Sequence, residues 1–224
     1  MDISIPTIVF NKGASWYCYQ HQPRYYVGDA LNTAKILSDS DVPEIAIMNL
    51  EENVSDSLLK IPRHTTRPIS LSGGISTIEQ ARKVIRAGYD RIGLTYPFQN
   101  APELADQVVK ELGASSLVIH IRIQEGDNIP SLIEDVINSH QASEFVIHDV
   151  NSAGTLGGLN SDIVKLLTQN TDCNFAISGG FNGDSGLESL RVYYSTKFMF
   201  PLLRDRLYSS VNERDLASFL VRPI

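Results

Sequence analysis

Two copies of a Ser-Gly-Gly motif are the residues best suited to bind an anion. The first copy lies in ISLSGGI, which starts at Ile69, and the second in FAISGGF, which starts at Phe175. A strand that ends in these residues and leads into a helix leaves backbone N–H groups uncovered, and the helix dipole favours an anion there. One copy alone would equally fit a tight strand-to-helix turn. Two copies predict phosphate groups at both ends of a ligand, bound by Gly73 and Gly74 and by Ser178, Gly179 and Gly180.

Other polar residues lie where they could add to such a site. Gly154 and Thr155 follow the run EFVIHDV and would offer amide and hydroxyl donors beside the second motif. In SLVIHIRI, Val118, His120 and Arg122 alternate to one face, and His148 is expected to point the same way. If that face is interior, it carries a cationic cluster suited to an anion. A lone histidine is more often structural than functional, and we do not expect His148 to act as a base.

The elements that must position these residues follow a β/α rhythm. Apolar β-branched runs alternate with amphipathic segments, which is typical of a parallel sheet. The clearest predicted helix spans residues 76–87, with Ser76 and Glu79 as a capping box and Gly88 at its end. The expected strands are SIPTIVF, EIAIMNL, RPISLS, DRIGLT, SLVIHIRI, EFVIHDV and NFAIS.

The internal repeat selects a closed barrel over an open sheet. Two half-barrels, residues 1–106 and 107–224, would place the two Ser-Gly-Gly motifs after strands 3 and 7, on opposite sides of one mouth. We therefore predict an α/β fold, a single-domain (β/α)8 TIM barrel. The eighth unit is expected within RVYYSTKFMF and to be irregular, because that segment is more polar than a usual barrel strand. Residues 11–29 are expected to form an aromatic loop that is either a lid or a packed surface loop.

The composition excludes several classes of function. The 224 residues suffice for one domain, and 26 acidic against 19 basic residues argue against a nucleic-acid partner. A basic leader and a run of 18 apolar residues are both missing, so we expect a cytoplasmic protein without membrane contact. Cys18 and Cys173 lack the spacing of metal ligands. We expect no metal and no cofactor.

Three stretches carry a family resemblance. SLSGGISTIEQARKVIRAGYDRIGLT, HDVNSAGTLGGLNSDIV and FAISGGF resemble the cyclase (synthase) subunit of imidazole glycerol phosphate synthase, and more distantly its isomerase relative in histidine biosynthesis. The resemblance covers roughly residues 3–182. YYVGDALNTAKILSDSDVPEIAIMNLE is most similar to paralogues from surface-polysaccharide gene sets, which pair with a glutaminase and supply ammonia to a sugar amidotransferase. The family resemblance implies two phosphate sites, a glutaminase on the N-terminal barrel face and ammonia passing through the barrel.

The resemblance transfers unevenly to individual residues. Val9 and Arg122 stand where the family has its catalytic aspartates, and neither can serve as the general acid or base of the cyclase reaction. Standard cyclase activity is therefore not expected. Asn49 replaces the strand 2 aspartate. The remaining matches are the phosphate glycines Gly74, Gly154 and Gly180, the polar ligand Thr95 and the pocket residue His148.

Charged residues at strand starts match the family's ammonia gate. Glu44, Arg91 and Glu144 occupy the strand 2, 4 and 6 positions, and alternate strands of a barrel share an interior layer. The strand 1 arginine of the family is missing, since Ile3 or Ser4 lies there. The alternative is that these three residues form an ordinary solvated rim.

Three functions remain open on the sequence alone. The first is a cyclase-like barrel that binds a phosphorylated metabolite and receives ammonia from a glutaminase without the standard aspartates. The second is a divergent cyclase/lyase or sugar-phosphate isomerase that uses residues such as His148, Asp149 or Arg122. The third is a non-catalytic subunit that binds a phosphometabolite.

Overall fold

Eight parallel strands close into a barrel. The computed structural model describes residues 4–19, 22–40, 42–98, 103–155, 157–169, 173–181 and 190–195. Each strand pairs with the next, and the last pairs with the first, which confirms the predicted (β/α)8 barrel. The barrel strands are β1 (Ser4–Asn11), β4 (Ile45–Asn49), β5 (Ile69–Ser72), β6 (Arg91–Tyr96), β7 (Leu117–Ile123), β8 (Glu144–Asp149), β9 (Phe175–Ser178) and β10 (Arg191–Ser195).

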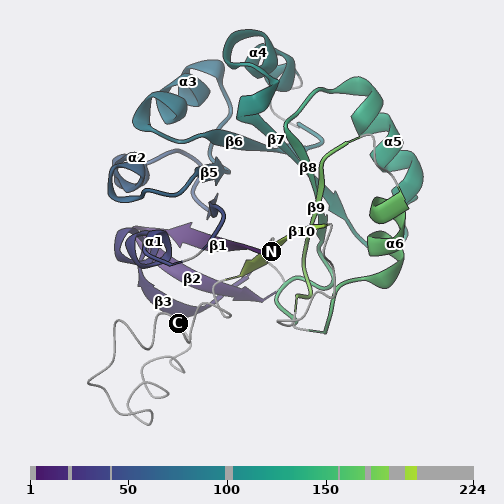
Figure 1. The fold of residues 1–224 in the computed structure, drawn as a ribbon, viewed down its shortest axis with the longest axis horizontal. Helices are drawn as coiled ribbons and strands as arrows, with labels where there is room; N and C mark the ends of the chain where they lie inside the picture. The colour runs from purple at the N-terminus through teal and green to yellow at the C-terminus, as the bar shows by residue number, and fades with distance from the viewer. Residues whose placement is uncertain are drawn as a thin grey trace.

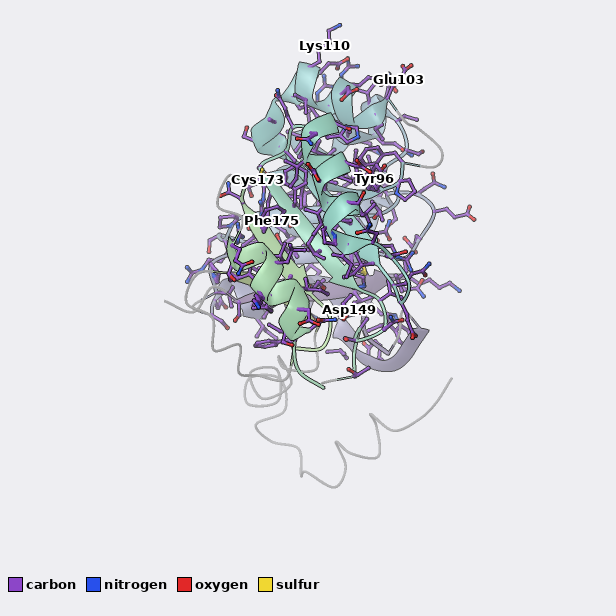
Figure 2. All side chains as sticks on the ribbon, turned by 90° about the vertical axis from the view of Figure 1, so that its right-hand side faces the viewer. Tyr96, Glu103, Lys110, Asp149, Cys173 and Phe175 are labelled. Atoms are coloured by element: carbon purple, nitrogen blue, oxygen red, sulfur yellow. The ribbon has the colours of Figure 1, made fainter. Side chains whose placement is uncertain are left out.

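The helices lie outside the ring of strands (Figure 1). Figure 2 shows this outer surface from the side, with Glu103 at the start of α4 and Lys110 in its last turn. An apolar stripe on each longer helix packs against outward-facing strand residues, and this layer forms the main core. The helices are α1 (Ala30–Ser38), α2 (Asp56–Lys60), α3 (Ile78–Ala87), α4 (Leu104–Leu112), α5 (Ile129–Ser139) and α6 (Ser161–Gln169), with 3-10 turns η1 (Ile61–His64) and η2 (Ala114–Ser116).

The N-cap of α3 lies one residue later than the sequence indicates. Thr77, not Ser76, is the N-cap, and its hydroxyl accepts from the backbone N–H of Gln80 at 3.2 Å. The Gln80 side chain accepts in return from the Thr77 N–H at 3.1 Å. Gly88 ends the helix with φ 109, as predicted. The motif TIEQ thus satisfies the capping-box pattern as well as STIE does, and the geometry selects the former.

A β-hairpin occupies residues predicted to form a loop. β2 (Ala14–Tyr19) pairs antiparallel with the end of β1 and with β3 (Gln22–Asp29). The prediction of a loop was wrong. The tyrosines of this segment and Trp16 are residue types that favour strands. β10 pairs with the first half of β1, from Ser4 to Thr7, and β2 pairs with the second half. The hairpin therefore extends the sheet at the carboxyl end of β1.

The eighth strand closes the barrel in regular parallel pairing. Val192 of β10 lies opposite Ile177 of β9 and Ser4 of β1. Over the described part of the eighth unit, Arg191–Ser195, the expected irregularity is not found. The rest of the segment RVYYSTKFMF lies outside the described residues, as do residues 182–189 between β9 and β10.

Candidate functional site

A ring of charged side chains lies across the barrel at the N-terminal ends of the strands. Arg91 donates to Glu44 at 2.5 Å and to Glu144 at 3.2 Å. Arg191 pairs with the same two carboxylates at 2.6 and 3.0 Å. The glutamate side chains are 7% and 1% exposed, so their charges are almost wholly removed from water. The structure thus brings the three predicted residues together and adds a fourth, and we call Glu44, Arg91, Glu144 and Arg191 the charged ring.

Alternate strands supply this ring. Its members begin or precede β4, β6, β8 and β10, and side chains from alternate strands of a barrel share one layer. Arg191 of the last strand supplies the second positive charge of the ring, where the family resemblance led us to expect a residue of strand 1. Sequence reasoning missed Arg191 because the eighth unit was expected to be irregular. The signal was available, since Arg191 begins the polar run RVYYS.

Tyr193 covers the ring from the inside of the barrel. Its hydroxyl donates to Glu144 Oε2 at 2.6 Å and accepts from Arg91 at 3.2 Å. Burial, and then the nearby glutamates, raise the pKa of Tyr193 far above its usual value. Burial alone would lower the pKa of Arg91, but its bond to Glu44 and the charge of Glu144 outweigh this and raise it. Tyr193 therefore stays neutral and Arg91 stays charged at neutral pH.

An apolar layer lies inward of the charged ring. It consists of small and branched side chains with the Tyr193 ring, namely Ile5, Ala46, Val118, Val146, Ala176 and Tyr193. These residues alternate along their strands with outward-facing core residues, as a barrel requires. The axis of the barrel is thus ionic at its N-terminal end and apolar above it.

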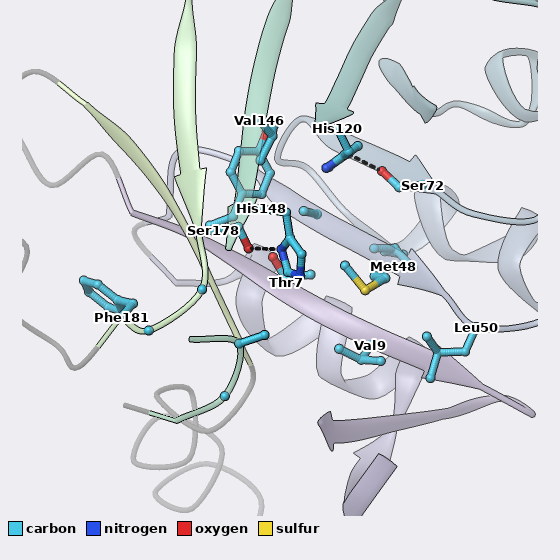
Figure 3. A pocket seen from close by; sticks show the side chains of 17 residues that line it. Thr7, Val9, Met48, Leu50, Ser72, His120, Val146, His148, Ser178 and Phe181 are labelled. Atoms are coloured by element: carbon cyan, nitrogen blue, oxygen red, sulfur yellow. Dashed lines mark hydrogen bonds between the residues drawn. The ribbon is translucent and has the colours of Figure 1, made fainter. Parts of the chain in front are cut away.

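A pocket opens from this layer toward the carboxyl ends of the strands (Figure 3). Two hydroxyl–imidazole pairs line it. His120 Nε2 lies 2.8 Å from Ser72 Oγ, and His148 Nδ1 lies 3.0 Å from Ser178 Oγ. Both serines are the first residues of the Ser-Gly-Gly motifs. The repeat therefore delivers one hydroxyl to a histidine on each side of the pocket.

Gly93 permits the first pair to form. Ser72 and His120 lie on β5 and β7, and β6 runs between them. A Cβ at Gly93 would lie 1.9 Å from Ser72 Oγ and 2.7 Å from His120 Nε2. The glycine on the middle strand is what lets the two side chains meet across it.

The predicted cationic cluster does not form. Burial, and then the charge of Arg91, lower the pKa of His120 to about 4, so this imidazole is neutral at pH 7. Arg122 is exposed and lies in a neighbouring cleft rather than in this pocket. Of the four predicted pocket residues, His120 and His148 line the pocket. The Asn49 amide instead donates to the carbonyls of Glu51 and Asn53, which holds the loop after β4.

His120 should make folding sensitive to acid. Its folded pKa of about 4 lies below the ordinary 6.5, so the unfolded chain binds a proton that the folded chain does not. The free energy of unfolding should therefore fall as the pH drops from about 6.5 to 4. NMR should show the His120 ring titrating near 4, and His120→Gln should remove its share of the slope. A midpoint near 6.5 would contradict the burial argument.

The glycines of the two motifs pack against neighbouring loops. Gly73 and Gly179 have φ of 87 and 106, and a Cβ on them would lie 2.3 and 2.4 Å from the backbone oxygens of Asn49 and Asp149. At Gly180 a Cβ would lie 2.1 Å from the Gly158 oxygen. These glycines are thus required by the fold itself. A substitution there would disturb the loops even without a ligand.

The predicted phosphate residues divide between two openings. Gly154, Ser178, Gly179 and Gly180 line the pocket, whereas Gly73 and Thr95 line the cleft that also holds Arg122, with a volume of about 700 Å³. Thr155 donates its hydroxyl to Ser152 at 2.9 Å and so closes a turn beside Gly154. Gly74 is half-buried against Asn49. Two separate openings therefore lie at the carboxyl ends of the strands.

Valine 9 contributes only an apolar surface to the pocket. It lies at the end of β1 and is 4% exposed. The Asp149 carboxylate accepts from the backbone of Asn151 and Ser152 and from the Ser152 hydroxyl, which fixes the loop after β8. Among the described residues, no cluster of histidine, cysteine and acidic side chains could hold a metal ion. No helix in the described ranges is long and apolar enough to cross a membrane.

These features define a (β/α)8 barrel with two openings at the carboxyl ends of the strands, which is the face where (β/α)8 barrels carry their sites. The chain belongs to the histidine biosynthesis protein family, whose sequence profile matches residues 2–198. It is 24% identical over 179 residues to an imidazole glycerol phosphate synthase subunit HisF from Francisella philomiragia, covering 69% of this chain and 70% of the relative. A subunit of the same name from Desulfatibacillum aliphaticivorans is 21% identical, covering 84% and 88%.

An isomerase is similar to the chain at the same level. The imidazole-4-carboxamide isomerase of Clostridium acetobutylicum is 26% identical over 176 residues, covering 71% of this chain and 73% of the relative. The sequence is therefore about equally similar to cyclase subunits and to isomerases of the family.

Proposed function

We propose that this barrel is the synthase-side partner of a glutaminase, binding a phosphorylated metabolite and receiving ammonia along its axis. The arrangement of three layers along that axis carries the proposal. The charged ring lies at one end, the apolar layer in the middle and the pocket with its two histidines at the other. A glutaminase on the N-terminal face would release ammonia at the ring.

The chemistry of each layer suits this route. Ammonia is small and neutral, so the apolar layer costs it little, while ions would have to lose their water to enter. His120 is neutral because its pKa is about 4, and a neutral imidazole would not protonate the passing ammonia. The ammonia would then reach the pocket as a nucleophile.

The carboxyl ends of the strands would hold the ligand. Arg122 supplies a permanent positive charge at the larger opening, and the glycine-rich loops supply N–H groups at the other. The name of the isomerase relative describes a substrate with two phosphoribosyl groups. A ligand with two phosphates would fit the two openings.

The standard cyclase reaction is not part of the proposal. The family resemblance of the sequence would put Val9 and Arg122 at the positions of the catalytic aspartates. The described pocket holds imidazoles and hydroxyls but no carboxylate among its lining residues. The acceptor of the ammonia would therefore be a different phosphorylated molecule, and the notion of a sugar acceptor rests on the resemblance to polysaccharide paralogues.

Arg122→Ala should weaken binding of a bisphosphate. A charged hydrogen bond to phosphate contributes about 1.5–3 kcal/mol, so we expect an affinity loss of roughly tenfold or more. Calorimetry with fructose 1,6-bisphosphate would measure it. Arg122 is exposed, so the variant should fold normally.

Arg63→Ala is the matched control, because it removes an equal charge from an exposed site in η1, ahead of β5. The two variants should differ clearly in affinity. Equal affinity in both would remove Arg122 from the phosphate site.

A further inference from the structure

The hairpin extends the inner face of the barrel with aromatic side chains. Val9 of β1 pairs directly with Trp16 of β2, and Trp16 pairs with Tyr26 of β3. Directly paired residues of antiparallel strands share one face. Val9 faces the pocket, so Trp16 and Tyr26 lie on the continuation of that face. Their neighbours Ser15 and Val27 are buried on the opposite face, at 0% and 6% exposure.

The two aromatic rings are fixed against each other. Their centroids lie 5.9 Å apart in an edge-to-face arrangement, and the indole N–H of Trp16 donates to the Asn11 carbonyl at 3.1 Å. Tyr26 is nevertheless 47% exposed, and Leu50 at the end of β4 is 38% exposed. Within the described residues, these two are the exposed large hydrophobic side chains. We call Val9, Trp16, Tyr26 and Leu50 the aromatic ledge.

The pocket beside the ledge has two unlike walls. Figure 3 shows Val9 and Leu50 on one side, with Met48 nearby, and Phe181 on the other side near the ends of β9 and the loop after β8. The second wall is formed by Gly154, Gly179 and Gly180. One wall is therefore apolar, and the other consists of backbone.

We infer that the ledge is a subsite for a ring, so that the preferred ligand is a phosphate ester whose other end is a flat or apolar-faced ring. The phosphate would bind at the glycine wall, and the ring would stack against Tyr26 and Trp16. Aromatic contacts of this kind are favourable beyond their buried area. Val9 extends the apolar surface of the ledge into the pocket. An aspartate at this position would break that apolar surface. The inference rests on the proposed phosphate site, which it deepens by naming the ligand class.

The only tryptophan of the chain provides the test. Trp16 emission and calorimetry should be followed during titration of the full chain with glycerol 3-phosphate, glucose 6-phosphate and adenosine monophosphate. A ring-bearing ester should bind about five- to tenfold more tightly than glycerol 3-phosphate and should change the Trp16 emission. Preference for the nucleotide would identify a heterocycle, and preference for the sugar phosphate would identify a pyranose face.

Two variants locate the ring. Tyr26→Ala should abolish the advantage of the ring-bearing esters and leave glycerol 3-phosphate binding unchanged, whereas Tyr26→Phe should retain the advantage. Leu50→Ser, at a second exposed position, should also reduce it. Equal affinity for all three esters, or an advantage that survives Tyr26→Ala, would overturn the ledge while leaving the phosphate site standing. Failure of all three esters and of a bisphosphate to bind would overturn both proposals.

Discussion

Arg91→Ala is expected to lower the free energy of unfolding by about 3 kcal/mol. Removal of one partner from a buried ion pair leaves the other charge uncompensated, which typically costs 3–5 kcal/mol. Glu44 and Glu144 would retain Arg191, which is 34% exposed and is the weaker partner for that reason. Tyr193 would also lose its donor from Arg91. Denaturant unfolding followed by circular dichroism would measure the change.

Arg82→Ala is the matched control for this result. Arg82 pairs with Glu111 on the outer surface, with both side chains about a third exposed or more. Such pairs contribute at most about 1 kcal/mol. If Arg91→Ala costs no more than Arg82→Ala, the ring is a solvated rim and not a buried network.

The second large effect concerns the cyclase reaction. Given the substrate of imidazole glycerol phosphate synthase and excess ammonia, the chain should form the imidazole product at least about 10⁴-fold more slowly than an authentic cyclase subunit. One positioned acid or base contributes about 10²–10⁴-fold, and Val9 and Arg122 supply neither. Product formation should be quantified with both proteins under identical conditions.

A turnover near the common enzyme value of about 10 per second would refute this expectation. In that case His120 and His148 with their serine partners would be the first residues to replace. His148→Gln in the full chain would show whether an imidazole carries the reaction.

The sequence predicted the barrel because its strands alternate regularly and its motif repeats at half its length. It also predicted three members of the charged ring, because the family resemblance implies charged residues at the starts of strands 2, 4 and 6. Arg191 was missed because a strand with two tyrosines and a serine departs from the apolar pattern that identifies barrel strands. The hairpin was missed because polar residues between its tyrosines indicated a loop.

The site required three-dimensional information for a different reason. Whether His120 meets Ser72 depends on Gly93 of the strand between them, and no local pattern contains all three residues. The low pKa of His120 likewise depends on burial and on Arg91, which lies far away in the sequence. Arg122 was grouped with the histidines from the direction of alternation, which does not tell how far along the barrel a side chain reaches. Asn49 was grouped with them only from the family resemblance.

The position of the glutaminase on the barrel tests the central claim most directly. Amide hydrogen exchange of this chain should be measured alone and with a purified candidate glutaminase subunit. We expect slower exchange at the N-terminal ends of β6, β8 and β10, around the charged ring, and no change in the loops after β8 and β9. Absence of a complex, or protection confined to the loops at the carboxyl ends, would contradict an ammonia route through this barrel.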